Sequence, residues 1–517
     1  MSDWSQEPRA DSYDAVVIGS GFGGVSAAAL LARAGLSVLL CERAENVGGY
    51  GHTIERGGYI FDPAVRVTHA AGPGGLYPAV LEHIGTSDRC RLVPVPRIYD
   101  VGLPDGRLLR VPAGFQELID AYSGMFPESA EGFESFFRMC LLMHEQGHAM
   151  PMMLGLHNLD EAAATYPEYF AHQRRTLDEV AREHIPDDQA RSAACALWPY
   201  QGAVPSQVGF IAVAQVLMNA VEGSYYSMGG FQTLIDAVIA GLEAYGGDVV
   251  TRNGAKRILV VDGKATGVVL ESGHEVRAPL VVSNADARQT FLELVGADLL
   301  PANFLRRLER MTPSHSAFVA FVGTDLDLGA LDIAHEVFIP TEWDHEVDAA
   351  NIAEGRPAGT WIGVTTLVDP SLAPEGEHAI TVSAIAAYDI DRPWEAHRQT
   401  YCELLLERAE RVIPDLRNNI KFLETATPET LERFTGNTGG AIYGWEQSPL
   451  QSGTRRLPHV TPIEGLLLSG HWTLPGSGST RSFASGVHTA GIALRMLGAG
   501  PPLPPAAASA ANLPALD

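Results

Sequence analysis

The chain has 517 residues, of which 36 are Lys or Arg and 62 are Asp or Glu, so its formal net charge is −26 at pH 7. A chain of this sign repels nucleic acid and has no general attraction to anionic lipid, which excludes polyanions as general partners. Its length is sufficient for a large hydrophobic core and favours two domains.

The first predicted elements are a strand, a glycine-rich turn, a helix and a second strand. Residues 15–18 are an apolar run suited to a buried parallel strand, residues 25–34 are rich in Ala and Leu, and the apolar residues 37–41 end at Glu42. The glycines that complete G-x-G-x-x-G are Gly19, Gly21 and Gly24. In this arrangement the backbone can approach a pyrophosphate at the helix N-terminus, and the acidic residue can accept ribose hydroxyls. The pattern predicts a Rossmann-like dinucleotide-binding unit.

The residues after Glu42 narrow the choice of nucleotide. Residues 43–50 read R-A-E-N-V-G-G-Y, and the glycine pair gives the backbone room beside a second group, which suits a flavin extending beyond its pyrophosphate. Residues 51–62 read G-H-T-I-E-R-G-G-Y-I-F-D. Together these motifs resemble the extended fingerprint of the FAD-dependent amine oxidase superfamily. In closer detail they are similar to the branch of phytoene desaturases, carotenoid isomerases and retinol saturases.

The resemblance covers nearly the whole chain and implies a discontinuous α/β architecture. It implies a Rossmann-like FAD-binding domain and a substrate domain of antiparallel sheet plus helices. The expected boundaries are 13–111, 224–300 and 456–498 for the FAD-binding domain, and 112–223 and 301–455 for the substrate domain. The Pro/Ala-rich residues 499–517 are expected to form a disordered tail.

Residues 112–223 change to amphipathic helical patterns, most clearly at 115–126, 133–150 and 177–184. Two stretches concern the substrate. Residues 139–156 carry five methionines, which adapt well to a long apolar ligand, and residues 207–221 are almost entirely apolar. An ordinary buried helix explains each stretch as well, and the second has the length of a core helix rather than of a membrane span.

The second FAD-binding part begins at Tyr225, where Y-Y-S-M-G-G-F leads into a helix that ends near residue 245. Short strands are predicted at 249–250, 255–261, 265–270 and 275–282. The last strand runs into S-N-A-D at residues 283–286. The resemblance implies that the main chain of Ala255 contacts the adenine.

Residues 316–387 alternate with a period of two, which predicts an antiparallel sheet with one buried face. The strands are predicted at 317–322, 336–339, 360–368 and 379–387. An amphipathic helix is predicted at 394–412. We expect helices from the earlier insertion to cover this sheet.

Residues 465–486 combine a strand, a glycine-rich turn and a helix, and they resemble the C-terminal flavin motif of the family. The motif places residues 478–482 at a helix start beneath the isoalloxazine. Some relatives carry Gly-Asp where this chain has Gly470 and His471, so a carboxylate towards the ribityl chain is missing. Arg481 and Ser482 stand where small residues are common.

The resemblance assigns cofactor-binding residues motif by motif. They are Gly19, Gly21, Phe22, Gly23, Gly24, Glu42, Arg43, Gly48, Gly49, Tyr50, Ala255, Gly470, His471, Ser479, Thr480, Arg481 and Ser482. The catalytic residue is unknown, and the candidates beside the flavin motifs are His52, Arg66, His471 and Arg481. A helix cap or a pairing with the flavin phosphates equally explains His52 and Arg66. For Arg481 the alternatives are stabilisation of the anionic reduced flavin and a surface ion pair.

Only one dinucleotide fingerprint is present, so a dedicated NAD(P)H domain is not expected. The leading hypothesis is an FAD-dependent oxidoreductase that acts on C–C bonds of a polyene, isoprenoid or similar apolar chain. Hydride would pass to flavin N5, with oxygen or a quinone as possible electron acceptor. Related enzymes with this fold isomerise a polyene without net redox change, or saturate one double bond. Amine oxidation is less favoured, because Lys421 is the only lysine outside the FAD-binding strands; a non-enzymatic flavin-binding partner is the third class.

The remaining signals concern compartment and metal. The five cysteines are widely spaced without a C-x-x-C pair, so neither a disulfide framework nor a metal site is expected. Residues 1–12 contain no apolar signal core, and no stretch of about 18 uncharged apolar residues is present. We therefore expect a cytoplasmic protein with at most peripheral membrane contact.

Overall fold

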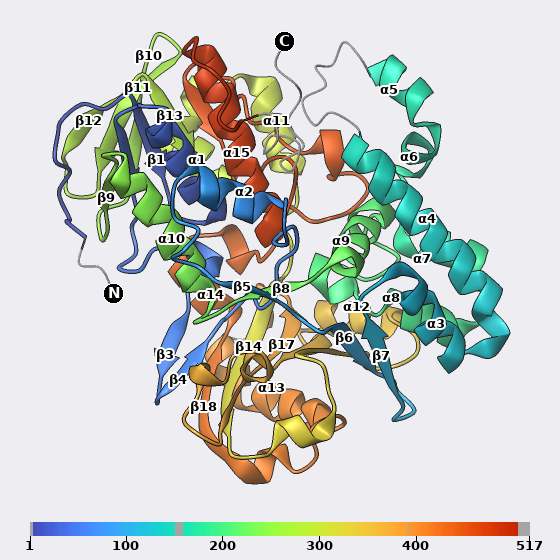
Figure 1. The fold of residues 1–517 in the computed structure, drawn as a ribbon. Helices are drawn as coiled ribbons and strands as arrows, with labels where there is room; N and C mark the ends of the chain where they lie inside the picture. The colour runs from blue at the N-terminus through green and yellow to red at the C-terminus, as the bar shows by residue number, and fades with distance from the viewer. Residues whose placement is uncertain (1–3, 150–158, 392, 505–517) are drawn as a thin grey trace.

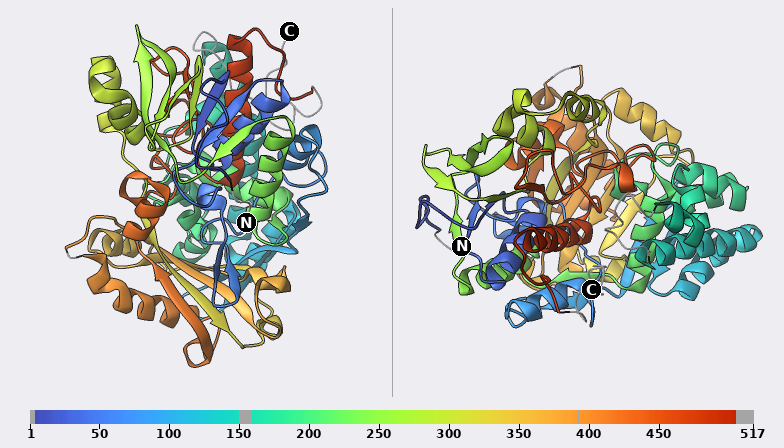
Figure 2. Two further views of the ribbon diagram at one scale, coloured as in Figure 1. Left: turned by 90° about the vertical axis from the view of Figure 1, so that its left-hand side faces the viewer. Right: turned by 90° about the horizontal axis from the view of Figure 1, so that it is seen from above.

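The computed structural model describes residues 4–149, 159–391 and 393–504. It combines a parallel-sheet unit with an antiparallel-sheet unit, which lies below it in the view of Figure 1, and the chain passes between the two more than once. Helices from residues 115–222 stand together at one side, as the view from above shows (Figure 2). The predicted α/β fold, with a Rossmann-like part and an antiparallel sheet plus helices, is confirmed.

The parallel-sheet unit is built on five short strands in the order β19-β13-β1-β2-β9. They are β1 (Ala15–Ile18), β2 (Val38–Cys41), β9 (Asp248–Val250), β13 (Leu280–Ser283) and β19 (Leu466–Leu468). Every residue of these strands is buried. A parallel sheet covered on both faces has this property, which explains the nearly unbroken apolar runs in the sequence.

Three helices cover this sheet: α1 (Phe22–Arg33), α10 (Phe231–Ala244) and α15 (Ser479–Met496). Helix α1 packs against both of the others. Its small residues allow the close approach to α15, where the Ser26 hydroxyl lies 2.9 Å from the Phe483 carbonyl oxygen. The two helices that begin at glycine-rich turns therefore lie side by side.

A three-stranded antiparallel sheet extends the parallel-sheet unit: β10 (Ala255–Val261), β11 (Lys264–Leu270) and β12 (Glu275–Arg277). The prediction of a single strand at 275–282 is wrong. That segment contains β12 and β13, which belong to different sheets. Pro279 stands between them and lacks the N–H that a continuous ladder would need.

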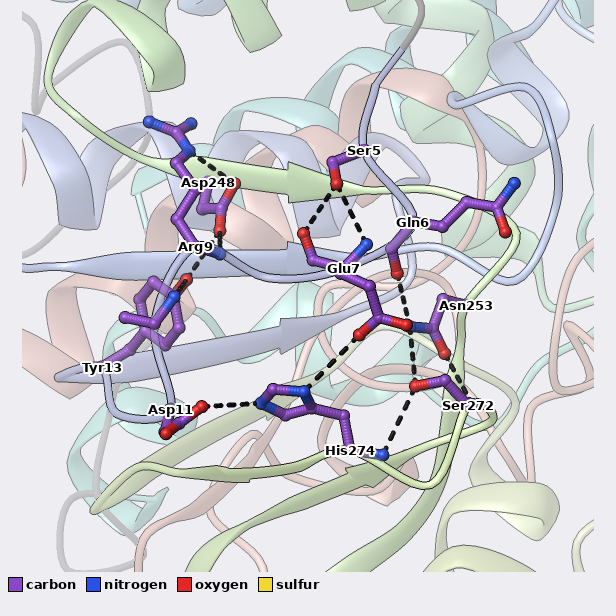
Figure 3. A network of polar contacts seen from close by, with 11 residues as sticks. Ser5, Gln6, Glu7, Arg9, Asp11, Tyr13, Asp248, Asn253, Ser272 and His274 are labelled. Atoms are coloured by element: carbon purple, nitrogen blue, oxygen red, sulfur yellow. Dashed lines mark hydrogen bonds and ion pairs between the residues drawn. The ribbon is translucent and has the colours of Figure 1, made fainter.

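The N-terminal segment, residues 5–13, lies along the parallel-sheet unit, and Figure 3 shows the polar contacts that hold it. Arg9 forms an ion pair with Asp248, with 2.9 Å between Nε and Oδ1. The Tyr13 hydroxyl donates a 2.6 Å hydrogen bond to the same carboxylate. Burial, together with Asp248, raises the pKa of Tyr13, so the hydroxyl keeps its proton.

The antiparallel-sheet unit has seven strands in the order β18-β14-β17-β16-β15-β6-β7. They are β6 (Arg97–Gly102), β7 (Leu108–Pro112), β14 (Ser316–Thr324), β15 (Glu336–Ile339), β16 (Ala358–Gly363), β17 (His378–Ala386) and β18 (Ile420–Ala426). Strand β6 pairs in parallel with β15. The domain boundary predicted after residue 111 is therefore wrong, because the β6–β7 hairpin belongs to this sheet and pairs with a strand far away in the sequence.

Both faces of the sheet are buried along its four central strands β14, β15, β16 and β17, against the prediction of one buried face. Alternate side chains of β14 enter two different clusters: Phe318 packs with helix α13 (Trp394–Ala409), whereas Val319 packs with the helices of the insertion. The period of two therefore separates two apolar environments. The strand predicted at 360–368 ends earlier, at Gly363, where the chain leaves the sheet.

The insertion contains seven helices among the described residues: α3 (Phe115–Met125), α4 (Ala130–Ala149), α5 (Leu159–Thr165), α6 (Pro167–His172), α7 (Leu177–His184), α8 (Asp188–Cys195) and α9 (Phe210–Glu222). Helix α7 has the predicted bounds because a capping box fixes its start: the Thr176 hydroxyl accepts from the Glu179 N–H, and the Glu179 carboxylate accepts from the Thr176 N–H.

The two stretches singled out for the substrate fall on α4 and α9. Helix α9 begins at Phe210 and most of it is buried, as a core helix would be; this burial does not separate that alternative from a role at the substrate. Helix α4 carries Met139 and Met143, and the second of these is buried. The other three methionines of the stretch, at positions 150, 152 and 153, lie outside the described residues.

Shorter elements connect the units: α2 (Leu76–His83), α11 (Ala302–Arg310), α12 (Glu346–Ala353), α14 (Pro428–Thr435), β3 (Ile54–Arg56), β4 (Tyr59–Phe61), β5 (Leu92–Pro94) and β8 (Tyr225–Ser227). Leu503 is 1% exposed and packs in the core of the parallel-sheet unit. The prediction of a disordered tail from residue 499 is therefore wrong for this part of the segment. Residues 505–517 lie outside the described residues. None of the helices in the described ranges is long and apolar enough to span a bilayer.

Candidate functional site

Three strand ends of the parallel sheet meet at the first turn of α1. Asn284 follows β13 and Gly470 follows β19, and both contact this turn. A Cβ atom on Gly23 would lie 2.6 Å from the Gly470 nitrogen, and one on Gly24 would lie 2.0 Å from the Gly19 carbonyl oxygen. Side chains are therefore impossible there, and the turn is a bare backbone cradle at a helix N-terminus. Such a cradle suits a pyrophosphate.

Glu42 lies at the end of β2, beside this cradle. Its carboxylate accepts hydrogen bonds from the Ser20 N–H (2.9 Å), the Ser20 hydroxyl (2.6 Å) and the Ala44 N–H (2.8 Å). The side chain is half-buried, and these donors are all uncharged. The Asn253 N–H donates to the Glu42 main-chain oxygen at 3.1 Å, which brings Ala255 at the start of β10 to the same strand end. An acid in this position suits ribose hydroxyls.

The glycine pair after Glu42 backs onto the cradle. The Gly48 N–H donates to the Ser20 hydroxyl at 3.0 Å, and a Cβ atom on Gly49 would lie 3.2 Å from the Gly21 Cα. His52 closes the same turn, with Nδ1 2.5 Å from the Gly49 carbonyl oxygen. Burial lowers the pKa of His52, so the ring is neutral and caps the turn.

Two other residues assigned to the cofactor make contacts elsewhere. Arg43 is exposed, and its guanidinium donates to the Arg433 carbonyl oxygen on α14 at 2.8 Å. The Tyr50 hydroxyl donates to the Ala441 carbonyl oxygen at 3.2 Å. Both side chains therefore tie the segment after Glu42 to residues 428–441.

The first turn of α15 faces a second set of polar groups. The Thr68 hydroxyl lies 3.1 Å from the hydroxyls of both Ser479 and Thr480, and the Thr480 hydroxyl lies 3.2 Å from the His69 carbonyl oxygen. Gly478 is the N-cap and supplies no side-chain acceptor. The N-terminus of α15 therefore keeps the positive partial charge of its free N–H groups.

Arg481 stands in this first turn and reaches across to α9. Its Nη2 donates to the Gln215 side-chain oxygen at 2.9 Å and approaches the Ala212 carbonyl oxygen at 3.4 Å. Among the described residues no carboxylate pairs with Arg481. The alternative of a surface ion pair for this residue is therefore wrong. Burial lowers the pKa of Arg481. The site thus holds a cation that no carboxylate of the described residues compensates.

His471 lies on the other side of the glycine-rich turn, against a second buried arginine. Arg456 donates to the His471 carbonyl oxygen at 2.5 Å. The His471 ring packs edge-on against Trp472, with 5.3 Å between ring centroids. Burial, reinforced by Arg456, lowers the pKa of His471 to about 3, so the ring is neutral. A protonated ring is disfavoured here first because the site is buried and second because the Arg456 guanidinium is near.

Arg66 forms a closed cluster with Glu336 and Tyr200. Its Nε donates to Glu336 Oε1 at 2.9 Å, and the Tyr200 hydroxyl donates to Glu336 Oε2 at 2.5 Å. The Arg66 and Glu336 side chains are 2% and 1% exposed. Burial alone would lower the pKa of Arg66, but Glu336 reverses this and raises it. Arg66 therefore fastens the loop after β4 to β15 and is neither a helix cap nor free for a phosphate.

Several residues of the site were not among the predicted ones. Asn284 belongs to S-N-A-D at the end of a parallel strand, and the rule that ligands lie at such strand ends could have identified it. Gln215 and Tyr200 come from the insertion, where no local motif marks them. In the described ranges no three His, Cys, Asp or Glu side chains gather as a metal site would require, and all five cysteines are buried free thiols.

Comparison with known proteins agrees with this geometry. The family model described as flavin containing amine oxidoreductase matches residues 22–494. The chain is 28% identical over 504 residues to a chloroplastic prolycopene isomerase of Arabidopsis thaliana. This alignment covers 92% of the present chain and 81% of the relative. It is 27% identical over 485 residues to a neurosporene-forming phytoene desaturase of Rhodobacter capsulatus, covering 91% and 92%.

A crystal structure of an oxidoreductase from Methanosarcina mazei has the same fold, with a TM-score of 0.62, 19% identity and coverage of 92% of this chain and 99% of the other. The backbone cradle, the acid at the end of β2 and the open helix N-terminus at α15 together match the donor and acceptor needs of FAD. The chain therefore belongs to the flavin-containing amine oxidoreductase family and is an FAD-dependent oxidoreductase.

Proposed function

We propose that this oxidoreductase acts on a C–C bond of a polyene, isoprenoid or similar apolar chain. The observation that carries the proposal is the wall opposite the first turn of α15. Arg481 reaches α9, and the buried side chains of α9 belong to the same apolar cluster as α4 and β14. A substrate that offers mainly C–H groups suits such a wall. The similarity to a phytoene desaturase and to a prolycopene isomerase supports the same class.

The structure does not support amine oxidation, because the candidate lysine, Lys421, is engaged elsewhere. Lys421 lies on β18, is 49% exposed and forms an ion pair with Asp325, with 2.7 Å between Nζ and Oδ2. Lys264 pairs with Glu464 at the surface, and Lys256 is exposed on β10. These three are all the lysines of the chain. An amine-oxidase-like lysine near the flavin therefore has no counterpart here.

We place the pyrophosphate of FAD, bound non-covalently, at the cradle of residues 19–24, its ribose at Glu42, and its ring system at the first turn of α15. When bound, FAD supplies the hydride acceptor or donor. The protein contributes position and charge. The helix N-terminus and the unpaired Arg481 favour negative charge at the edge of the ring, while neutral His471 adds none. The surrounding apolar cluster excludes water.

A second candidate is cis–trans isomerisation or saturation of a polyene. The same positive charge favours it, because both reactions start from reduced flavin, and the prolycopene isomerase similarity supports it. For the desaturase reaction we propose oxygen or a quinone as electron acceptor, and for the protein at most peripheral membrane contact.

Anaerobic mixing of the purified flavin-containing protein with a polyene tests the proposal. Bleaching of the flavin together with formation of a longer conjugated product supports desaturation. A change of polyene geometry only with pre-reduced flavin supports isomerisation, and loss of one double bond supports saturation. Flavin bleaching by an amine such as putrescine, with no reaction of any polyene, contradicts the proposal.

A further inference from the structure

A surface hollow of about 520 Å³ lies between α11 and the segment 450–455, and none of its lining residues belongs to the cradle or to α15. Four arginines line it: Arg306, Arg307, Arg310 and Arg455. Leu450 stands at its edge and is 77% exposed. Nothing in the proposed oxidoreductase reaction uses these residues.

Hydrogen bonds to the main chain fix the walls of the hollow. Arg307 Nη2 donates to the carbonyl oxygens of Arg455 (3.0 Å) and Arg456 (2.8 Å). Arg455 Nη1 donates to the Pro449 carbonyl oxygen at 3.1 Å. The Gln451 side chain accepts from the Thr312 N–H at 2.7 Å. Arg307, Arg455 and Gln451 are therefore held in place by the fold, whereas Arg306 and Arg310 are exposed beside them.

The charge of this hollow is the opposite of the rest of the protein. Acidic residues outnumber basic ones by 62 to 36 in the chain, yet no carboxylate among the described residues pairs with any of the four arginines. The side chains of Arg306 and Arg310 have no hydrogen-bond partner in the described ranges. Glu309, the single acid of α11, does not line the hollow. The hollow therefore concentrates positive charge in a chain that is acidic overall.

Arg174 adds a further positive charge near Arg455, although it does not line the hollow. Burial lowers the pKa of Arg455, and the nearby Arg174 lowers it further. A surface with several arginines and no paired carboxylate attracts a negatively charged ligand. Guanidinium groups are planar and donate in pairs, so several converging on one hollow match the oxygens of a phosphate group.

We propose that the hollow is a binding site for the phosphate group of an anionic ligand, separate from the FAD site. Arg306 and Arg310 supply the free donors, while Arg307 and Arg455 hold the walls. The phosphate could be carried by a lipid headgroup, with Leu450 contacting the apolar part of the lipid, or by a soluble phosphorylated compound. Both sources present the same chemistry to the arginines, and the experiment separates them.

The test uses the FAD-loaded 517-residue protein and two probes at low ionic strength. The first probe is a soluble phosphate: inorganic phosphate and glycerol phosphate are each titrated into the protein, and calorimetry measures their affinity. The other is co-sedimentation with phosphatidylglycerol–phosphatidylcholine vesicles, with pure phosphatidylcholine vesicles as the uncharged reference. The variant is Arg306→Gln with Arg310→Gln. Its matched control is Arg89→Gln with Arg91→Gln, which removes the same charge from two exposed arginines without a side-chain partner in the described residues.

We expect the Arg306/Arg310 variant to lose about tenfold or more in affinity for the binding probe, as the loss of one or more charge-assisted hydrogen bonds requires. The control should stay within about twofold. Binding of the soluble probe assigns a soluble ligand. Binding of anionic vesicles alone, weakened further by Leu450→Ser, assigns a lipid headgroup. If neither probe binds, or if both double variants lose affinity equally, the proposal is wrong. Unchanged flavin absorbance and unfolding temperature show that each variant is folded.

Discussion

The cluster around Arg66 and the groups around the first turn of α15 are both enclosed, but they treat charge in opposite ways. Arg66 is matched by Glu336, whose second oxygen is taken by Tyr200, so every strong partner is inside the protein. Among the described residues, the Arg481 guanidinium donates only to the amide oxygen of Gln215 and to a carbonyl oxygen. A closed cluster fastens two units of the fold together, whereas an unmatched charge at a strand-end site leaves room for a ligand's charge. The same residue type therefore has a structural role in one region and a ligand-directed one in the other.

The largest effect is expected from opening the closed cluster. Glu336→Gln leaves the buried Arg66 without its counter-ion and should lower the free energy of unfolding by about 3–5 kcal/mol. Denaturant titration measures it. Glu134→Gln breaks the exposed pair with Arg138 and should cost only about 0–1 kcal/mol. Equal costs for the two variants would contradict the distinction between a closed cluster and ordinary surface pairs.

The next effect concerns the open side of the comparison. Glu42→Ala removes an anionic acceptor beside the cradle, and FAD affinity should fall by roughly 1.5–3 kcal/mol, because ribose hydroxyls lose a charge-assisted hydrogen bond. Titration of the apoprotein with FAD measures the dissociation constant. Glu45→Ala, three residues further along and exposed, is the control and should leave it unchanged. An unchanged dissociation constant for Glu42→Ala would show that Glu42 does not bind the ribose of FAD.

A pH series sharpens the comparison for His471. Because its folded pKa is lowered to about 3, the unfolded chain binds a proton between pH ~6.5 and ~3 that the folded chain does not. Stability from this residue is complete above pH ~6.5 and is lost as the pH falls. His471→Gln should therefore reduce the slope of unfolding free energy against pH by up to ~1.4 kcal/mol per unit in that window. Parallel curves for variant and parent would show that His471 is not a buried neutral group.

The smallest effect tests the unmatched charge directly. Arg481→Met should lower the flavin midpoint potential by tens of millivolts, since about 30 mV corresponds to 1.4 kcal/mol for a two-electron couple. Arg481→Lys keeps the positive charge, so its flavin midpoint potential should lie between those of the parent protein and of Arg481→Met. The potential is measured by dye-coupled reductive titration. An unchanged potential in a variant that still binds FAD would mean that Arg481 does not act on the reduced flavin.

Local rules were enough for the first part of the chain and for α7. Strand β1, the glycine turn, α1 and β2 follow from sterics and polarity within a short stretch, because only glycine fits where a Cβ on Gly24 would meet the Gly19 oxygen at 2.0 Å. Helix α7 starts where the Thr176–Glu179 capping box satisfies its free N–H groups. The C-terminal motif likewise indicated the position of α15. Cofactor and family were predictable for the same reason, since they rest on these compact motifs.

The sequence by itself thus determined the dinucleotide-binding elements, the FAD cofactor and the general class of reaction. The tertiary structure alone decided that the β6–β7 hairpin joins β15, that Arg66 is neutralised by Glu336, and that Arg481 meets Gln215 instead of an acid. Each of these depends on a contact between segments far apart in the chain. Local propensity and spacing carry no information about such partners, because the pairing is decided by how whole sheets and helices pack.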